Sequence, residues 1–130
     1  MVYKRHIVLF LILAACLVLA LSGCASNTEP IETESDFTGF ITDIQAGQAK
    51  DITGRISVES HADKIVSKYV ITVNKDTAIF RQDGSNYNKA EFKELEARQW
   101  VKIWFTGPVL ESWPMQATAL QIVITGQTVE

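Results

Sequence analysis

The sequence predicts a mainly β domain, built as a small five-stranded barrel with one short helix between its third and fourth strands. Three observations support this prediction. Short runs rich in β-branched residues recur roughly every ten residues from residue 36 onward. Clusters of Gly, Asp, Asn and Ser separate them, as turn-forming residues do between strands. One stretch before residue 100 changes from the spacing of a strand to that of a helix.

The first three predicted strands occupy residues 36–44, 54–60 and 68–73. The first strand contains Gly39, and a glycine inside a strand often marks a bulge or a sharp bend. Small barrels need such bends for the sheet to curl. The third strand consists mostly of β-branched and aromatic residues, which favour the extended conformation.

The segment after the third strand predicts a turn and then the helix. A brief apolar run, residues 78–80, is followed by a turn cluster over residues 83–86. Asn88 is then a suitable N-cap for a helix of about two to three turns. Its charged residues would face water, and its apolar residues would face the barrel. These apolar residues are Ala90, Phe92 and Leu95.

Strict alternation returns in residues 100–107 and predicts the fourth strand. One face carries Val101, Ile103 and Phe105, and the other carries Trp100, Lys102 and Trp104. Residues 111–114 form a predicted loop, because Pro114 disfavours a helical conformation in the residue before it. Residues 117–125 supply the fifth strand. Three strands, a helix and two more strands is the order of elements in an OB-fold, a five-stranded Greek-key barrel.

Three groups of residues resemble a known family. They are Phe37-Thr38-Gly39 with Ile41, Val101-Lys102-Ile103-Trp104-Phe105, and Glu111-Ser112-Trp113-Pro114 followed by Gln116, Ala117 and Ala119. Through them, residues 36–124 resemble the YobA-like domain of unknown function, which occurs in small lipoproteins of Gram-positive bacteria. The chain departs from that pattern at Trp113, where tyrosine is more frequent, and at Ala97-Arg98-Gln99, where a glycine is usual. The resemblance implies a fold and a cell-envelope location, but no activity.

Residues 1–23 have the organisation of a secretory signal peptide, with Lys4 and Arg5 before an apolar run and small residues after it. The residues Leu21-Ser22-Gly23-Cys24 resemble the lipobox of bacterial lipoproteins, in which the cysteine thiol receives a diacylglycerol and signal peptidase II cuts before that cysteine. We therefore expect cleavage between Gly23 and Cys24 and a lipid, including palmitate, on Cys24. The alternative is an uncleaved transmembrane helix, but the apolar run of 15 residues is shorter than the ~20 that span a bilayer.

The remaining chain divides into two parts. Residues 24–35 are polar and acidic, contain a proline, and are expected to form a lipid-anchored flexible tether. Residues 36–126 form the predicted barrel domain. The expected location is therefore the extracytoplasmic face of the cell membrane, with the membrane as a partner through the lipid on Cys24.

Charge and cysteine content exclude several classes of function. The chain has a net charge of −3, and residues 1–23 contain two of its basic side chains, so removing them makes the domain more acidic. An acidic domain has no electrostatic attraction for nucleic acids or anionic lipid headgroups. Cys16 and Cys24 are the two cysteines, so lipidation of Cys24 would leave no thiol for a disulfide, a zinc site or a nucleophile.

The sequence offers little chemistry for catalysis. His61 is the single histidine after residue 23, and it lies in a polar stretch expected to join two strands. Oxygen-bearing side chains from Asp83 onward approach the spacing of a calcium loop, but Tyr87 is a poor ligand and Asn88 replaces the glycine of the sharp turn. We expect no enzyme activity, no cofactor and no metal. The alternative is a small hydrolase that acts on cell-wall material through carboxylates.

Aromatic residues supply the candidate binding site. Trp100 and Trp104 lie on one strand face, about 13 Å apart, with Lys102 between them. Trp113 adds a third indole in the loop before the last strand. Their predicted ligand is a glycan, a peptide or a protein, and the expected function is a non-catalytic binding module of the cell envelope. The alternative is that the helix or the chain after Pro108 covers one or both of Trp100 and Trp104, and that Trp113 beside Pro114 only fixes the loop.

Overall fold

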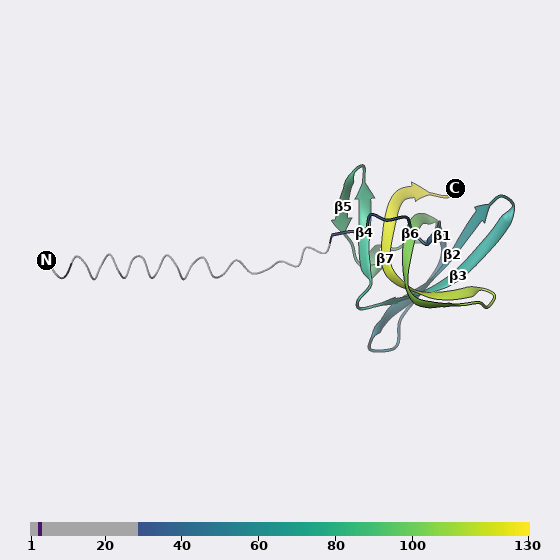
Figure 1. Ribbon diagram of the computed structural model, residues 1–130, viewed down its shortest axis with the longest axis horizontal. Helices are drawn as coiled ribbons and strands as arrows, with labels where there is room; N and C mark the ends of the chain where they lie inside the picture. The colour runs from purple at the N-terminus through teal and green to yellow at the C-terminus, as the bar shows by residue number, and fades with distance from the viewer. Residues whose placement is uncertain (1–2, 4–28) are drawn as a thin grey trace.

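The computed structural model describes Tyr3 and residues 29–130 of the chain. Within residues 29–130 the chain forms seven strands and one short 3-10 helix (Figure 1). The elements are β1 (Phe37–Ala46), β2 (Ile52–Ala62), β3 (Ile65–Asn74), β4 (Ala78–Asp83), β5 (Asn86–Lys89), η2 (Phe92–Glu94), β6 (Gln99–Leu110) and β7 (Met115–Thr128). The predicted cleavage site and Cys24 lie outside the described residues. No helix in the part described is long and apolar enough to cross a membrane.

Five of the strands close into a barrel, as the sequence predicted. Neighbouring strands pair in the order β3-β2-β1-β6-β7, and a parallel pairing between β3 and β7 joins the two ends of that order. The closing pairs run from Tyr69 opposite Met115 to Thr72 opposite Thr118. The first half of β7 therefore closes the barrel, and its second half is free to pair with another strand.

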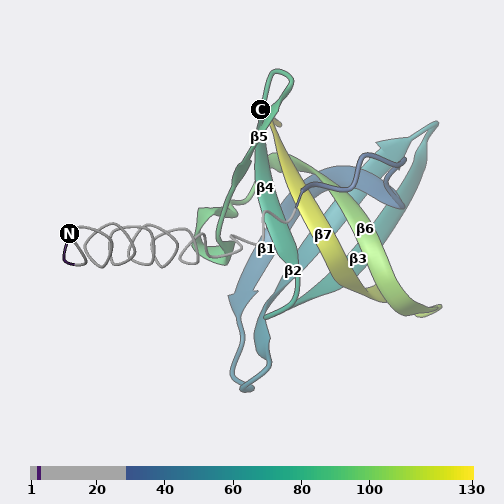
Figure 2. The ribbon, with the colours of Figure 1, turned by 60° about the vertical axis from the view of Figure 1, so that its left-hand side comes forward.

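The remaining two strands, β4 and β5, extend the sheet beyond the barrel. The strand β4 runs parallel to the second half of β7, with Ala78 opposite Gln121 and Arg81 opposite Ile124. Figure 2 shows β4 next to β7, with β5 on the far side of β4. The brief apolar run at residues 78–80 begins β4, and its Ile79 side chain belongs to the main core cluster, so β4 also covers part of the core.

The interior of the barrel contains the inward-facing side chains of alternating strand positions. A Cβ atom on Gly39 would overlap the carbonyl oxygen of Glu59, so only glycine allows β1 to pass this close to β2. A register shift follows between Ile41 and Asp43, in agreement with the bend that the sequence indicated. The largest fully buried side chains of this core are Ile41, Ile56, Val58, Ile71, Val73, Val101, Ile103, Ile122 and Ile124, while Val123 and Gln121 are equally buried outside it.

The predicted helix from Asn88 is wrong. Gly84, with a φ of 60°, lies in a tight turn that folds β5 back onto β4, so that Asn88 pairs with Arg81 in a strand. Too few residues then remain before β6 for more than the 3-10 turn η2. The apolar residues of the predicted helix still contact the core: Leu95 is buried and Phe92 packs against it. A Cβ on Gly54 would overlap the Phe92 ring, so this glycine makes the space that Phe92 fills.

Two hairpins project from one end of the barrel, and we call them arms. The β2–β3 arm comprises residues 60–67, and its turn residues Asp63 and Lys64 both have positive φ, as a two-residue hairpin turn requires. The β6–β7 arm comprises residues 107–114. Both arms leave the same end because β3 and β7 start there and run parallel. Figure 1 shows them diverging on the side opposite β4 and β5.

Candidate functional site

The three tryptophans do not form one surface. Trp100 is half-buried on the outer face of β6, Trp104 is 8% exposed, and Trp113 is 69% exposed in the β6–β7 arm. The sequence placed Trp100 and Trp104 on the same strand face, and the structure agrees, because both point away from the core that contains Val101 and Ile103. What the sequence did not show is that different neighbours surround each indole.

Trp104 is covered by residues that precede the barrel. Its indole N–H donates to the carbonyl oxygen of Thr33 at 3.2 Å and approaches the Thr33 hydroxyl oxygen at 3.3 Å. Its ring belongs to a small apolar cluster with Phe80 and Val123, against which Ile31 packs. No helix covers the indole. Val123, in the chain after Pro108, contributes to its burial, and Ile31 and Thr33 belong to the segment that was expected to be a flexible tether.

Gln121 holds the same segment. It is 1% exposed, and its side-chain oxygen accepts from the Ile31 backbone N–H at 2.7 Å. Its amide nitrogen donates to the Ile31 carbonyl oxygen at 3.2 Å. Further along, the Asp36 carboxylate accepts from the Phe105 backbone N–H at 2.8 Å. We call residues 31–35 the strap; they are the last part of the expected tether, 24–35, and they lie against the barrel.

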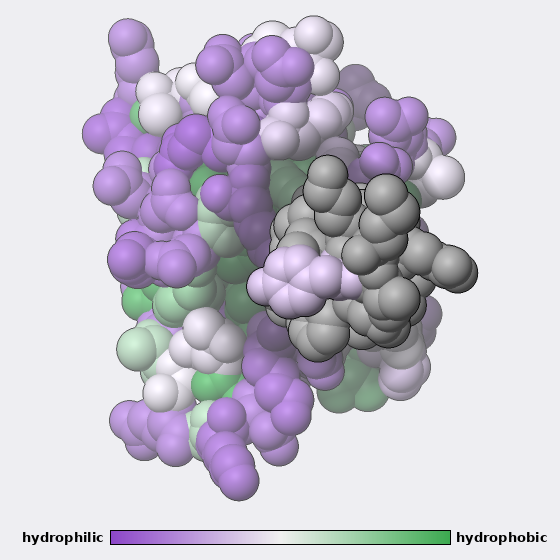
Figure 3. Space-filling model, turned by 90° about the vertical axis from the view of Figure 1, so that its left-hand side faces the viewer, coloured by the Kyte–Doolittle hydropathy of each residue, from purple (hydrophilic) through white to green (hydrophobic). Residues whose placement is uncertain are grey.

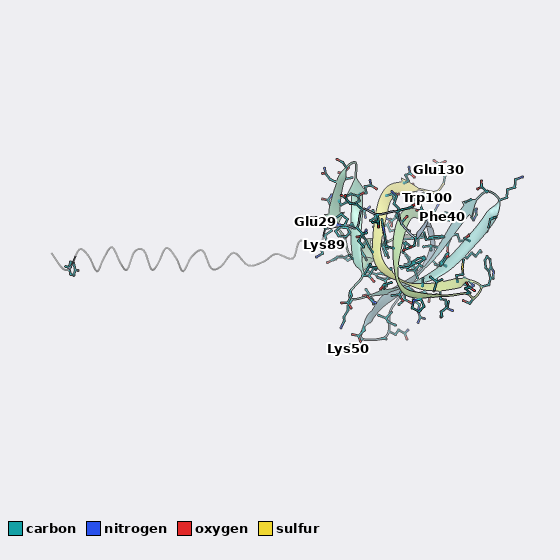
Figure 4. The ribbon with its side chains drawn as sticks, viewed as in Figure 1. Glu29, Phe40, Lys50, Lys89, Trp100 and Glu130 are labelled. Atoms are coloured by element: carbon teal, nitrogen blue, oxygen red, sulfur yellow. The ribbon has the colours of Figure 1, made fainter. Side chains whose placement is uncertain are left out.

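Trp100 and Lys102 line an open hollow of about 380 Å³ between β6, β7 and the β4–β5 hairpin. The other lining residues are mainly amides and hydroxyls: Thr38, Gln82, Gly84, Thr125 and Gln127. The Trp100 ring makes an edge contact with Phe40, with 5.8 Å between the ring centroids (Figure 4). An indole beside several hydrogen-bonding side chains is a suitable surface for a polar ligand with an apolar face.

A charged network borders this aromatic pair. Phe40 also contacts His61, which lies in β2 and not in a loop as the sequence indicated. Glu59 lies 3.2 Å from His61 and 2.9 Å from the Lys68 ammonium group. The hydrogen bond from Lys68, and then the one from His61, lowers the pKa of Glu59 below its ordinary value. A carboxylate held ionised by two partners is a weak base, so this network does not favour the hydrolase alternative.

The arms expose the apolar residues that the sequence did not single out. Ile65 is 68% exposed and Leu110 is 56% exposed, and the exposed Trp113 follows Leu110 by three residues in the same arm. Val66 and Val109 are exposed as well. Ile65 and Val66 directly follow the two-residue turn at Asp63 and Lys64, and this position next to a hairpin tip is the signal that could have indicated their exposure.

An aromatic trio lies at the barrel end from which the arms project. Tyr69 contacts Phe37 with ring centroids 4.8 Å apart and Phe105 with centroids 5.4 Å apart. Phe37 is buried, and the other two rings are half-buried against the core. Side chains alternate along a strand, so Ile65 lies on the same face of β3 as Tyr69. Beyond Tyr69, this face of β3 therefore presents Ser67 and then the exposed Ile65.

Residues 38–125 match a family described as a protein of unknown function, DUF3221. The chain belongs to the DUF3221 family. The match begins in β1 and ends in β7, so it includes every strand of the barrel, both arms and Trp104 and Gln121. The strap precedes the matched region. No curated protein and no solved structure matches the chain.

The DUF3221 domain offers few groups for metal or acid–base chemistry. Among the described residues, no group of three or more His, Cys, Asp and Glu side chains could hold a metal ion. Several carboxylates are engaged by cations: Glu91 lies 2.9 Å from Lys93, and Glu94 lies 3.9 Å from Arg81. The hydrogen bond that the Lys93 ammonium group donates to the Glu91 carboxylate raises the pKa of Lys93. These exposed pairs are typical of a solvated surface.

Proposed function

We propose that the DUF3221 domain of this chain is a non-catalytic binding module, tethered by lipid on Cys24 to the extracytoplasmic face of the cell membrane, and that its arms bind an apolar surface of a protein partner. One observation carries the proposal. Of the large hydrophobic side chains exposed within residues 29–130, all except Tyr87 and Leu120 lie on the two arms. A cluster of exposed apolar side chains marks an interaction surface, whereas scattered ones do not.

The shape of the arms supports a partner that inserts between them. They diverge from one barrel end, with the trio Phe37, Tyr69 and Phe105 between their bases. Complete burial of a side chain such as Leu110 or Ile65 contributes at most about 1.5–3 kcal/mol. Three or four such side chains give enough free energy for specific binding after the cost of association.

The order of strands supports the same surface. In an OB-fold, ligands bind at the face of the second and third strands and at the loops that follow the first and fourth strands. If β6 and β7 correspond to the fourth and fifth OB strands, the β6–β7 arm with Trp113 takes the place of one of these loops. The parallel closure between β3 and β7 is consistent with this correspondence.

The anchor rests on residues 1–24. A basic start, an apolar run too short to span a bilayer, and small residues before Cys24 support cleavage and lipidation. A Cys24→Ala chain should incorporate no labelled palmitate and should not be cleaved by signal peptidase II. Unchanged maturation of this variant would contradict the anchor while leaving the proposal for the arms intact.

Photo-crosslinking in living cells tests the arms. A photoreactive residue placed at Leu110 or at Ile65 should give the same discrete adduct, because both positions face one partner. The matched control is Leu120, which is 43% exposed on β7 outside the arms and should give no such adduct. Trp113→Asp should abolish the adduct from position 110. Equal adducts from position 120, or none from either arm, would show that the arms are not the binding surface.

A glycan ligand is favoured by a different observation, the hollow beside Trp100. Its amides, hydroxyls and indole suit a sugar ring, which stacks on an aromatic face and hydrogen-bonds at its edge. Titration with soluble cell-wall fragments should then change the tryptophan emission of the wild-type chain and of Trp113→Phe, but not that of Trp100→Phe. No change in any of the three chains would exclude this ligand class at the concentrations used.

A further inference from the structure

The strap occupies a site on the outer surface of the DUF3221 domain that is independent of the arms. We propose that this strap site is a binding site for extended peptides with an aliphatic side chain, which the chain fills with its own residues 31–35. The strap site comprises Ala78, Phe80, Trp104, Gln121 and Val123, from the neighbouring strands β4, β6 and β7.

The contacts at the strap site are directed mainly at the peptide backbone. Gln121 donates to and accepts from the backbone of Ile31, and the Trp104 indole donates to the backbone carbonyl of Thr33. Every non-proline residue carries these backbone groups. Domains that bind extended peptides combine backbone hydrogen bonds with pockets for alternate side chains. The strap site has the first of these features in its two buried polar side chains.

The second feature is an apolar pocket at the position of Ile31. Phe80 is 3% exposed and Val123 is 1% exposed, and both lie in a cluster separate from the barrel core. Ile31 is the residue of the strap that packs against this cluster, while Glu32, Thr33 and Glu34 are exposed. A peptide would therefore need an aliphatic side chain at one position and would tolerate variation at the next three.

Gln121 is difficult to explain as a residue of the barrel alone. It lies opposite Trp104 on β6, it is 1% exposed, and both of its side-chain hydrogen bonds go to the strap. A buried amide needs a hydrogen-bonding partner, and here the partner is another stretch of backbone. A leucine would pack with Phe80 and Val123 without that requirement, so the amide serves to hold a peptide.

The strap can leave without disrupting the barrel. It contributes one half-buried apolar side chain and lies outside the main core, so its opening costs far less than global unfolding. An external peptide must compete with a segment tethered next to the site, whose effective concentration is in the millimolar range. We therefore expect the closed chain to bind such peptides weakly and a chain with a released strap to bind them more tightly.

The sequence around the strap narrows the class of peptide. Glu32 and Glu34 make the strap acidic, and Glu29 precedes it. Lys102 and Tyr87 line the hollow beside the strap. Pro30 precedes Ile31, and the chain before the strap lies next to the β4–β5 hairpin at Ser85–Tyr87. Figure 3 shows this side of the molecule, on which hydrophilic residues predominate outside the grey atoms. An acidic segment with one aliphatic residue is thus the best candidate.

The test uses the chain from residue 24 onward with Cys24→Ser, and its probe is a synthetic peptide with the sequence of residues 29–36. Ile31→Asp should release the strap and shift the indole N–H resonance of Trp104. Adding the peptide should restore that resonance at concentrations about tenfold lower than those at which it perturbs the wild-type chain. The resonances of Trp100 and Trp113 should not respond. A control peptide with Asp in place of the isoleucine should have no effect.

Two outcomes would overturn the proposal. The first is a folded Ile31→Asp chain, with a shifted Trp104 resonance, that binds neither peptide or binds both equally. The second is loss of the folded state in the Ile31→Asp chain. A separate experiment removes the strap differently, by cleaving a protease site inserted between Ser35 and Asp36. If the barrel unfolds in both experiments, the strap is an integral part of the fold and the site has no exchangeable ligand. The photo-crosslinking test of the arms can fail without affecting the result of either strap experiment.

Discussion

Trp104 and Gln121 are direct partners across β6 and β7, and both side chains hydrogen-bond to the strap. One supplies an N–H donor and an aromatic wall, and the other supplies a donor and an acceptor. Neither has a polar partner from the barrel among the described hydrogen bonds. The segment just after the expected anchor is therefore fixed to the domain by two residues from the last two strands.

Replacing Gln121 with leucine should loosen the strap without unfolding the barrel. The variant loses two hydrogen bonds to Ile31, each with a net contribution of about 0.5–1.5 kcal/mol. We expect the Trp104 indole N–H to exchange with solvent at least about fivefold faster by NMR. The control is Gln127→Leu, an exposed position on the same strand, which should leave this exchange rate unchanged. Equal rates in both variants would show that Gln121 does not hold the strap.

Gly39→Ala should destabilise the domain strongly. Its Cβ would meet the backbone carbonyl of Glu59, which cannot move aside as a flexible side chain could. Overpacking of this kind typically costs about 1–3 kcal/mol, to be measured by urea denaturation. Gly84→Asn is the matched control, because the space around Gly84 is open and asparagine tolerates its positive φ. A control change as large as that at Gly39 would refute the steric explanation.

The barrel could be predicted because its pattern is local. Alternating apolar residues and regularly spaced turns specify strands that are buried on one face, and these lie close to the predicted positions. The prediction of a helix was wrong because a local turn signal favoured a hairpin instead. The turn at Gly84 allows Asn86–Lys89 to pair with β4, so Asn88 and Lys89, which were expected at the start of the helix, lie in a strand.

The candidate site was less predictable because it depends on contacts between distant parts of the chain. Trp104 and Thr33 are 71 residues apart, and Gln121 and Ile31 are 90 apart. No periodic pattern links them, so the strap looked like part of a polar tether. The alternation did place Trp100 and Lys102 together correctly, and they do line one hollow. The exposure of Ile65 and Leu110 follows from the length of the arms beyond the barrel, which is a property of the assembled sheet.

The three indoles should differ in their accessibility to a quencher. Trp113 is exposed, so Trp113→Phe should remove most of the emission that acrylamide quenches readily. Trp104 is shielded by the strap, so Trp104→Phe should remove a blue-shifted component that is quenched poorly. Stern–Volmer analysis of the two variants measures both components. Identical quenching in the two variants would contradict the different environments of these residues.

The ion pair between Glu59 and Lys68 should make the stability of the domain depend on pH in the acidic range. Lys68 lowers the pKa of Glu59 from its ordinary value of 4.5, so the unfolded chain takes up this proton at a higher pH than the folded chain. The contribution is therefore fully present above pH 4.5 and is lost as the pH falls through the lower pKa of the folded state. Its size should not exceed about 1 kcal/mol, because the Lys68 side chain is exposed.

Denaturation curves measured between about pH 6 and pH 3 test this, because that range extends roughly 1.5 units to either side of an ordinary carboxyl pKa. Glu59→Gln removes the titrating group, and Lys68→Met removes the main cause of the shift, so both variants should lose less stability on acidification than the wild-type chain. Glu96→Gln, at an exposed carboxylate outside the described ion pairs, should behave like the wild type. If Glu59→Gln follows the wild-type curve throughout, the pair does not contribute to folding in solution.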